Sequence, residues 1–206
     1  MNSIGYKTAL TSKALQDKFS VTEPAYDVIY GECGFSGNSK FALEEGKSYR
    51  LECELAVVLK MDADHVPESK EELLSMIDYV FPALEIISSP EGKEQTIEDF
   101  IGNHCNYEAT VWGDYCASPY EIDWNLLGMR LEINGILSTS GTPEGVDGTP
   151  LGSLSWLIGR LLKDGKMLKA GEIVMTGSFV PSVPVKKGDY ARASYYKLGD
   201  VAVIFE

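Results

Sequence analysis

Apolar residues alternate with two glutamates in the run Leu51–Leu59, and this pattern predicts a β-strand over Tyr49–Leu59. Alternate side chains of an extended chain share a face, so Glu52 and Glu54 point to the same side, about 7 Å apart along the strand. Ala56 and Val58 continue this face, which therefore becomes apolar within two positions. A half-buried strand with one polar side is the simplest interpretation, but two carboxylates at the entrance to an apolar interior need a further reason.

A third carboxylate lies in a similar setting. Glu85 stands inside the apolar run Ala83–Ile87, which predicts a second buried strand. Glu85 alone could be a core residue paired with a lysine or arginine, but neither residue type lies within these apolar runs. Three converging carboxylates would raise one another's pKa strongly and would need a cation between them. A hard divalent ion prefers oxygen ligands, so Glu52, Glu54 and Glu85 are predicted to bind Mg²⁺ or Mn²⁺.

Capping and turn signals predict the other elements. The expected helices are Thr11–Phe19 with Thr11 or Ser12 as its cap, a segment from Ser69 to about Val80 that Pro82 ends, and a helix from Pro150, capped by Thr149, to Gly165. The expected strands are Leu127–Ile133 with an Asn134-Gly135 turn before Ile136-Leu137, then Glu172–Thr176, Ala191–Tyr195 and Val201–Phe205. Because strands dominate, the predicted class is α+β with a mixed, β-rich core.

Length and composition restrict the domain count and the partners. The 206 residues are expected to form one domain. A net charge of -13 argues against nucleic acid and anionic membranes as partners, and an anionic substrate would need a local cation. No signal peptide or membrane-length apolar stretch is recognisable. The four cysteines form no CxxC pair, so reduced thiols and a cytoplasmic location are expected. With only two histidines, a multi-histidine metal site or a conventional nucleophilic triad is not expected.

Short motifs along nearly the whole chain carry a family resemblance. They are Gly5-Tyr-Lys7, Glu23-Pro24, Glu52-x-Glu54 followed by Glu85, Gly148-Thr-Pro150-Leu151 ahead of Trp156-Leu157, and Gly171-Glu172 leading to Thr176-Gly177-Ser178. In this order and at these spacings they resemble the fumarylacetoacetate hydrolase superfamily. The resemblance is closest to its hydratase/decarboxylase branch, which contains 2-hydroxypentadienoate hydratase and 4-oxalocrotonate decarboxylase.

The resemblance implies a fold, an activity and roles for individual residues. It implies a β-rich fold of the family's C-terminal type with few helices, which binds a divalent metal through the three glutamates. The activity would be that of a lyase of aromatic catabolism acting on a small 2-oxo or 2-hydroxydienoate acid, as a hydratase in preference to a decarboxylase. A divalent ion would attract the acid and stabilise enolate character at its 2-oxygen. Lys7 would transfer a proton, Ser178, the loop Phe179–Val183 and Asn103 would contact the substrate, and a homo-oligomer is expected.

The chain departs from the family pattern at candidate acid/base positions. Ala25 replaces the aspartate that commonly follows the E-P proline, and Asp27 lies two positions on, a shift of about 7 Å that argues against a direct substitution. The family's D-N-A-S segment is present as Gly102-Asn103-His104-Cys105, so His104 is a second candidate, although a lone histidine is more often structural. Whether Asp27 or His104 takes over the role is left open.

The departures leave two alternatives to a lyase. The first is a degenerate homologue that keeps the metal and ligand pocket without turnover. The second is a hydrolase of carbon–carbon bonds, but this chemistry usually involves a histidine–glutamate pair, and neither histidine stands in a matching motif. Family members usually carry a helical segment before the G-x-K motif, and the expected domain over residues 1–206 lacks most of it.

Overall fold

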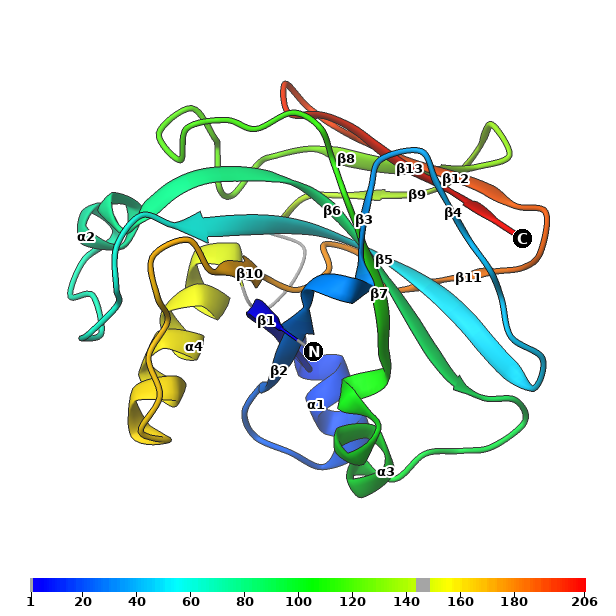
Figure 1. The fold of residues 1–206 in the computed structure, drawn as a ribbon, viewed down its shortest axis with the longest axis horizontal. Helices are drawn as coiled ribbons and strands as arrows, with labels where there is room; N and C mark the ends of the chain where they lie inside the picture. Colours follow the sequence, from blue (N-terminus) through cyan, green and yellow to red (C-terminus); the bar gives the residue numbers. More distant parts are fainter. Residues whose placement is uncertain (1, 144–148) are drawn as a thin grey trace.

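Two β-sheets form most of the protein, and the computed structural model describes residues 2–143 and 149–206 (Figure 1). The first sheet contains β1 (Ser3–Ala9), β2 (Ala25–Tyr30), β3 (Gly34–Ser36), β5 (Lys47–Leu59), β6 (Ile77–Pro90), β7 (Tyr107–Trp112), β10 (Ile173–Met175) and β11 (Val183–Val185). The second contains β4 (Ser39–Phe41), β8 (Met129–Ile133), β9 (Ile136–Gly141), β12 (Tyr190–Tyr195) and β13 (Gly199–Phe205). The helical elements are α1 (Lys13–Phe19), α2 (Lys70–Ser75), α3 (Ile97–Gly102), α4 (Pro150–Lys163) and the 3₁₀ turns η1 (Gly31–Cys33) and η2 (His104–Asn106).

The sheets are mixed, as the sequence predicts. The first has the order β2-β1-β10-β5-β6-β7-β3, with β11 also paired to β5, and the second has the order β4-β13-β12-β8-β9. The pairs β1–β10, β3–β7 and β4–β13 are parallel, whereas the long pair β5–β6 is antiparallel. The second sheet lies above β5 and β6 in Figure 1, and α1 and α3 lie side by side below them. The predicted β-rich α+β class is therefore confirmed.

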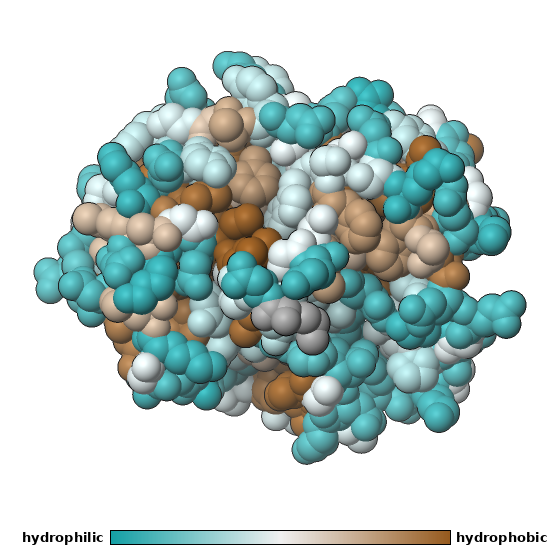
Figure 2. All heavy atoms as spheres, viewed as in Figure 1, coloured by the Kyte–Doolittle hydropathy of each residue, from teal (hydrophilic) through white to brown (hydrophobic). Residues whose placement is uncertain are grey.

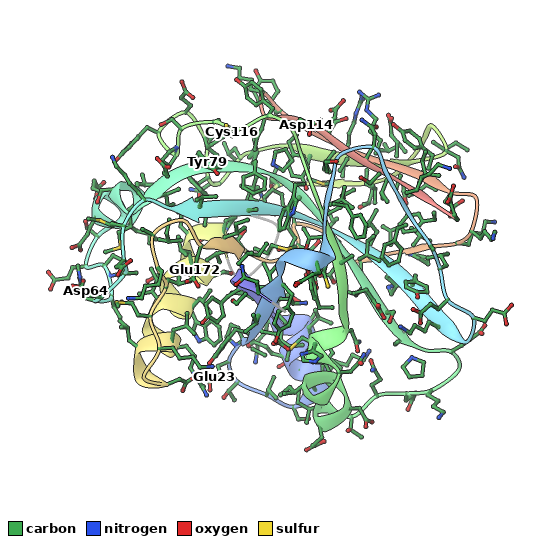
Figure 3. The ribbon with its side chains drawn as sticks, in the orientation of Figure 1. Glu23, Asp64, Tyr79, Asp114, Cys116 and Glu172 are labelled. Carbon is green, nitrogen blue, oxygen red and sulfur yellow. The ribbon has the colours of Figure 1, made fainter. Side chains whose placement is uncertain are left out.

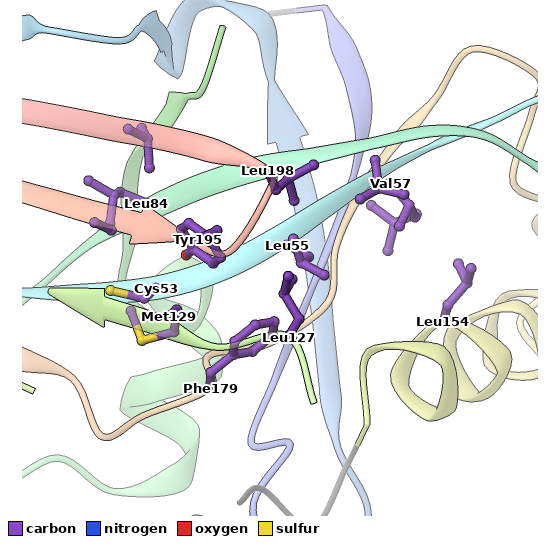
Figure 4. Packing of buried hydrophobic residues seen from close by; sticks show 14 of the residues in the cluster. Cys53, Leu55, Val57, Leu84, Leu127, Met129, Leu154, Phe179, Tyr195 and Leu198 are labelled. Carbon is purple, nitrogen blue, oxygen red and sulfur yellow. The ribbon is translucent and has the colours of Figure 1, made fainter. Parts of the chain in front are cut away.

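The two faces of β5 have different environments. Its odd-numbered residues from Leu51 to Leu59 are buried in the main core, where Figure 4 shows Cys53, Leu55 and Val57 with side chains from other strands. Ala56 and Val58, from the glutamate face, pack in a smaller apolar cluster on the other side of the sheet. The alternation read from the sequence is confirmed, and it places the glutamates on the face opposite the main core.

Helix α4 and the β8–β9 hairpin follow their local signals. Thr149 caps α4 by accepting a hydrogen bond from the Gly152 N–H at 3.1 Å, with Pro150 at the first helical position. The α4 stripe that contains Leu154, Leu157, Ile158 and Leu161 packs into the main core. The hairpin turns through residues with φ of 55° and 76°, at Asn134 and Gly135, as a two-residue turn with positive φ requires. Gly148, from one family motif, lies outside the described residues.

The helix expected from Ser69 to about Val80 is wrong in its extent. Ser69 caps α2 as predicted, but the helix ends at Ser75 and β6 begins at Ile77. Branched and aromatic residues from Ile77 onward favour an extended chain. Pro82 lies inside this strand, and its carbonyl accepts the Gly113 N–H at 2.9 Å. Because the nitrogen and carbonyl of one strand residue point to the same side, the missing N–H of Pro82 faces the end of β7 and leaves the ladder to β5 intact.

The surface is largely polar, and the acidic charge lies mainly on it. Hydrophilic side chains cover most of the face in Figure 2, with hydrophobic side chains visible in patches between them. The carboxylates of Glu23, Asp64 and Asp114, labelled in Figure 3, are exposed. All four cysteines are free thiols. Within the described ranges, no helix is both long and apolar enough to cross a membrane.

Candidate metal centre and acid-binding cavity

Strand pairing brings the three predicted glutamates together. Glu52 of β5 lies directly opposite Glu85 of β6, and Glu54 lies opposite Ala83. Directly opposed residues of antiparallel strands share a face, so all three carboxylates point to the same side. One ligand oxygen from each lies within 4.8 Å of the others. Glu54 and Glu85 are 1% and 0% exposed, and Glu52 is half-buried.

Two carboxylate oxygens of this cluster lack a protein partner. Glu54 Oε2 accepts the Gly177 N–H at 2.8 Å, and Glu85 Oε1 forms an ion pair with the Lys7 ammonium. Glu54 Oε1 and Glu85 Oε2 are buried without a hydrogen bond to any described residue. A buried acceptor left unpaired is costly. Two unpaired oxygens beside a third carboxylate fit a hard divalent cation, so the residues present suit the metal that the sequence predicts.

The pKa values of the clustered carboxyls also favour a bound cation. Burial, followed by the charge of Glu85, raises the pKa of Glu52 to about 7, and the same two causes raise the pKa of Glu54 well above its ordinary value. Without an ion, the cluster therefore favours protonated carboxyls over three charges. A cation would restore the carboxylate forms. The role of these residues as ligands stays a prediction.

Lys7 reaches the cluster from a different strand. It lies on β1, is 2% exposed, and also donates to the Cys105 carbonyl at 3.4 Å, with its ammonium 5.6 Å from the centre of the Tyr107 ring. Burial alone would lower the pKa of Lys7, but the carboxylates of Glu85 and Glu52 outweigh burial and raise it. Lys7 is therefore a cation at neutral pH, which suits a proton donor or an electrostatic partner. Its role in proton transfer stays a prediction.

The segment beside Lys7 adopts an unusual backbone. His104, Cys105 and Asn106 have φ of 50°, 52° and 63°, a left-handed run that is unfavourable for residues other than glycine. The Asn106 side chain exchanges two hydrogen bonds with Gln95, at 2.7 and 2.9 Å. Asn103 donates to Asn106 Oδ1 at 3.1 Å but is itself exposed. The strained turn thus directs Asn106 inward.

A cavity of about 530 Å³ opens onto the centre. Its polar lining includes Lys7, Glu52 and Ser178. The loop after Ser178 also lines it, from Phe179 to Ser182. The Ser178 hydroxyl donates to the Val180 carbonyl at 2.7 Å and accepts the Cys53 N–H at 3.1 Å, so it also supports the loop.

Asn103 was expected to contact the substrate, but it does not line the cavity. Asn106 lines it instead. The physical reason is the left-handed turn, which places Asn103 outside and Asn106 inside. Asn103 therefore contacts the lining only through its hydrogen bond to Asn106.

The cavity contains a cation that the sequence reasoning missed. Arg50 shares the face of Glu52 and lines the cavity, and its charge lowers the pKa of Glu52 against the larger effect of burial. The Arg50 Nε–H donates to Ser182 Oγ at 2.7 Å, and Nη2 donates to the Ser182 carbonyl. The signal was available, because Arg50 lies two positions before Glu52, but it stands just outside the apolar run.

The two candidate replacements for the family's acid/base lie against each other. His104 Nδ1 is 3.2 Å from Asp27 Oδ2. In the register of the antiparallel strands β1 and β2, Asp27 stands opposite Lys7. Neither residue lines the cavity, and the His104 side chain is 64% exposed. The pair is therefore placed to support the left-handed turn, at a distance from a cavity-bound molecule.

Fold and site together define a two-sheet protein with a cluster of three carboxylates, one of which, Glu52, lines a cavity. The chain belongs to the fumarylacetoacetate (FAA) hydrolase C-terminal family, whose profile matches residues 20–204. The resemblance read from the motifs is thereby confirmed.

Relatives and solved structures agree with this membership. The chain is 31% identical over 204 residues to the 2-keto-4-pentenoate hydratase of Paraburkholderia xenovorans (strain LB400), which covers 98% of this chain and 76% of that protein. It is 29% identical over 208 residues to the 2-oxo-hept-4-ene-1,7-dioate hydratase of Escherichia coli, covering 98% and 78%. The 4-oxalocrotonate decarboxylase from Pseudomonas putida G7, complexed with magnesium and adipate, superposes with a TM-score of 0.91 at 28% identity, covering 100% of this chain and 78% of that chain.

Proposed function

We propose that this protein is a divalent-metal-dependent hydratase that adds water to a small 2-hydroxydienoate acid, with Mg²⁺ or Mn²⁺ as the ion. The observation that carries the proposal is the cluster of Glu52, Glu54 and Glu85, with Lys7, beside a cavity of about 530 Å³. A cavity of this size suits a small organic acid. The hydratase names of the relatives support the same reaction.

The reaction has two parts, and the residues present suit both. In the first part, the dienol loses the proton of its 2-hydroxyl and gains one at C5, which leaves a 2-oxo acid with a C3–C4 double bond. In the second part, water adds its hydroxyl at C4 and its proton at C3. A divalent ion held by Glu52, Glu54 and Glu85 would supply Lewis-acid stabilisation of negative charge on the 2-oxygen.

The protein's own groups orient the acid and move the proton. Lys7 holds a proton at Nζ within the cavity lining, and Glu85 keeps that ammonium in place. The pKa of Lys7 is raised, so the residue enters the reaction in its protonated form. The apolar part of the lining limits the access of bulk water to the bound dienol.

Decarboxylation is the second candidate, because the solved structure with a TM-score of 0.91 is a decarboxylase. Both reactions pass through an enolate, so the same metal centre would serve either of them, and only the product distinguishes the two. Loss of a terminal carboxylate would need a substrate with two carboxylates, and it would release carbon dioxide.

The decisive experiment follows the conjugated chromophore. The protein is incubated with Mg²⁺ and 2-hydroxypenta-2,4-dienoate, and loss of ultraviolet absorbance is recorded with product analysis. We expect metal-dependent formation of 4-hydroxy-2-oxopentanoate, abolished by a chelator. Release of carbon dioxide from 4-oxalocrotonate without hydration of the dienoate would favour the second candidate. No turnover of any dienoate would leave the degenerate homologue.

A further inference from the structure

Two helices of the protein present apolar side chains to the cavity and bury none of their own residues. None of the residues of α1 or α3 is buried. Instead, Leu15 and Phe19 of α1 and Phe100 of α3 line the cavity. Leu15 is 39% exposed, although leucine is usually placed in a core. Apolar side chains that line an open cavity are typical of a site that covers them with a ligand.

The two aromatic residues form one wall. The rings of Phe19 and Phe100 lie with centroids 5.3 Å apart and their planes inclined by 32°. Leu10, Ile87 and Pro181 add further apolar lining. The cavity therefore combines a polar part at the carboxylates with an apolar wall on the two helices. A molecule that satisfies both parts has an anionic head and an apolar tail.

From this arrangement we infer that the protein selects 2-oxo and 2-hydroxydienoate acids whose chain ends in an alkyl or aryl tail, over acids of the same length with a second carboxylate. The inference rests on the proposed function for the head group of the acid. It adds the chemistry of the tail, and it assigns Phe19 and Phe100 as specificity-determining residues.

Two cations in the lining provide the competing interpretation. Arg50 and Lys18 line the cavity, and neither forms an ion pair with a carboxylate in residues 2–143 and 149–206. Arg50 is already engaged with Ser182 through Nε and Nη2. The Lys18 ammonium lies 5.4 Å from the centre of the Phe19 ring, and its side chain is exposed. A dioate would have to displace the Ser182 contacts or cover the aromatic wall with a charged group, and both are unfavourable.

The test measures binding and does not require turnover. The protein saturated with Mn²⁺ is titrated calorimetrically with 2-oxobutanoate, 2-oxopentanoate, 2-oxohexanoate and 2-oxoadipate, the last two having the same number of carbons. Each added methylene should lower Kd about four-fold, from about 0.8 kcal/mol per buried CH₂. 2-Oxoadipate should bind at least about ten-fold more weakly than 2-oxohexanoate, because its second charge meets the apolar wall.

Variants assign the effect to the wall. Phe19→Ala and Phe100→Ala should reduce the gain per methylene to less than two-fold, whereas Phe100→Leu, which keeps an apolar side chain, should retain most of it. Tyr196→Ala is the matched control, since Tyr196 is 67% exposed and lies outside the lining. It should leave the whole series unchanged. An unaltered shift of melting temperature with Mn²⁺ shows that each variant is folded.

The outcomes separate this inference from the proposed function. Tighter binding of 2-oxoadipate, a Kd independent of chain length, or no binding of any acid would overturn the inference. The expected binding series without hydration of any dienoate would overturn the hydratase and leave the tail preference standing. Hydration of a dienoate together with a Kd that does not change with chain length would overturn the tail preference and leave the hydratase standing.

Discussion

Replacing one carboxylate of the buried cluster tests the metal centre most directly. Glu54 is suited to this, because it is 1% exposed and one of its oxygens, Oε1, has no partner among the described residues. Glu54→Gln keeps the shape of the side chain and an oxygen that accepts the Gly177 N–H. It removes one negative charge next to Glu52 and Glu85. The variant should therefore lose metal binding without losing the fold.

The size of the expected effect follows from linkage. A ligand that binds only the folded state adds RT ln(1 + [L]/Kd) to the stability, about 2.7 kcal/mol at a free concentration of one hundred times Kd. For a domain of this length, 1 kcal/mol shifts the melting temperature by about 2–4 °C. Saturating Mn²⁺ should thus raise the melting temperature of the wild-type protein by about 5–10 °C above its value in chelator.

The variant should behave differently in the two conditions. In chelator, Glu54→Gln should melt at the same temperature as the wild type or higher, because charge repulsion in the cluster is relieved. With Mn²⁺, its shift should fall below about 2 °C at the same free concentration. Glu132→Gln is the matched control: Glu132 is a glutamate of β8, its side chain is 23% exposed, and it lies in the other sheet. It should keep the full shift.

The assay is differential scanning calorimetry at several Mn²⁺ and Mg²⁺ concentrations. If both ions leave the wild-type melting curve where the chelator puts it, the three glutamates are not a metal centre, and the hydratase loses its basis. A Glu54→Gln variant that responds to Mn²⁺ as strongly as the wild type would refute the role of Glu54 alone.

Three further predictions concern pH, catalysis and local strain. In chelator, Glu52 has a folded-state pKa of about 7 against an ordinary 4.5, so its stabilising effect is complete below pH 4.5 and is lost as the pH rises through 7; the melting temperature should fall over this range, measured by circular dichroism. Lys7→Met should lower kcat by about 10²- to 10⁴-fold in the ultraviolet assay, and Asp27→Asn by much less, because Asp27 does not line the cavity. Equal losses would give Asp27 the catalytic role. Gly135→Ala should destabilise the protein by about 1–2 kcal/mol in urea titrations, because φ is 76° there and a Cβ would meet no atom within 4 Å, which leaves backbone strain as the cost.

Much of the fold could be read where one local signal acts alone. On β5, the strict alternation assigned each side chain to its face, and the register then placed Glu85 opposite Glu52. At α4, Thr149 and Pro150 mark the first turn without ambiguity. Both predictions depend on residues that are neighbours in the sequence. Such local patterns predict the structure correctly when the tertiary contacts favour the same conformation.

The failures occur where distant segments decide. The capping signal at Ser69 was correct, but the end of α2 depends on the pairing of β6 with β5, which a local pattern does not contain. Likewise, the motif pointed to Asn103 and carried no sign of Asn106, whereas the left-handed turn places Asn106, and not Asn103, in the cavity lining. Asparagine and histidine adopt positive φ more often than most residues, but the local pattern does not predict three such residues in a row at His104, Cys105 and Asn106.

The cations that balance the charges of the centre come from outside the apolar runs that carry the glutamates. The three carboxylates carry three negative charges when ionised, and Lys7, from the neighbouring part of the sheet, offsets one of them through Glu85. The two that remain match one divalent ion, whereas a monovalent ion would leave a buried carboxylate uncompensated. An acid bound at the centre brings one more negative charge, and Arg50, on the same face and in the cavity lining, offsets it through space, as it does for Glu52, while it keeps its hydrogen bonds to Ser182. The net acidity of the chain is therefore no obstacle to an anionic substrate, since the balance is set locally by two cations from separate strands and by the metal.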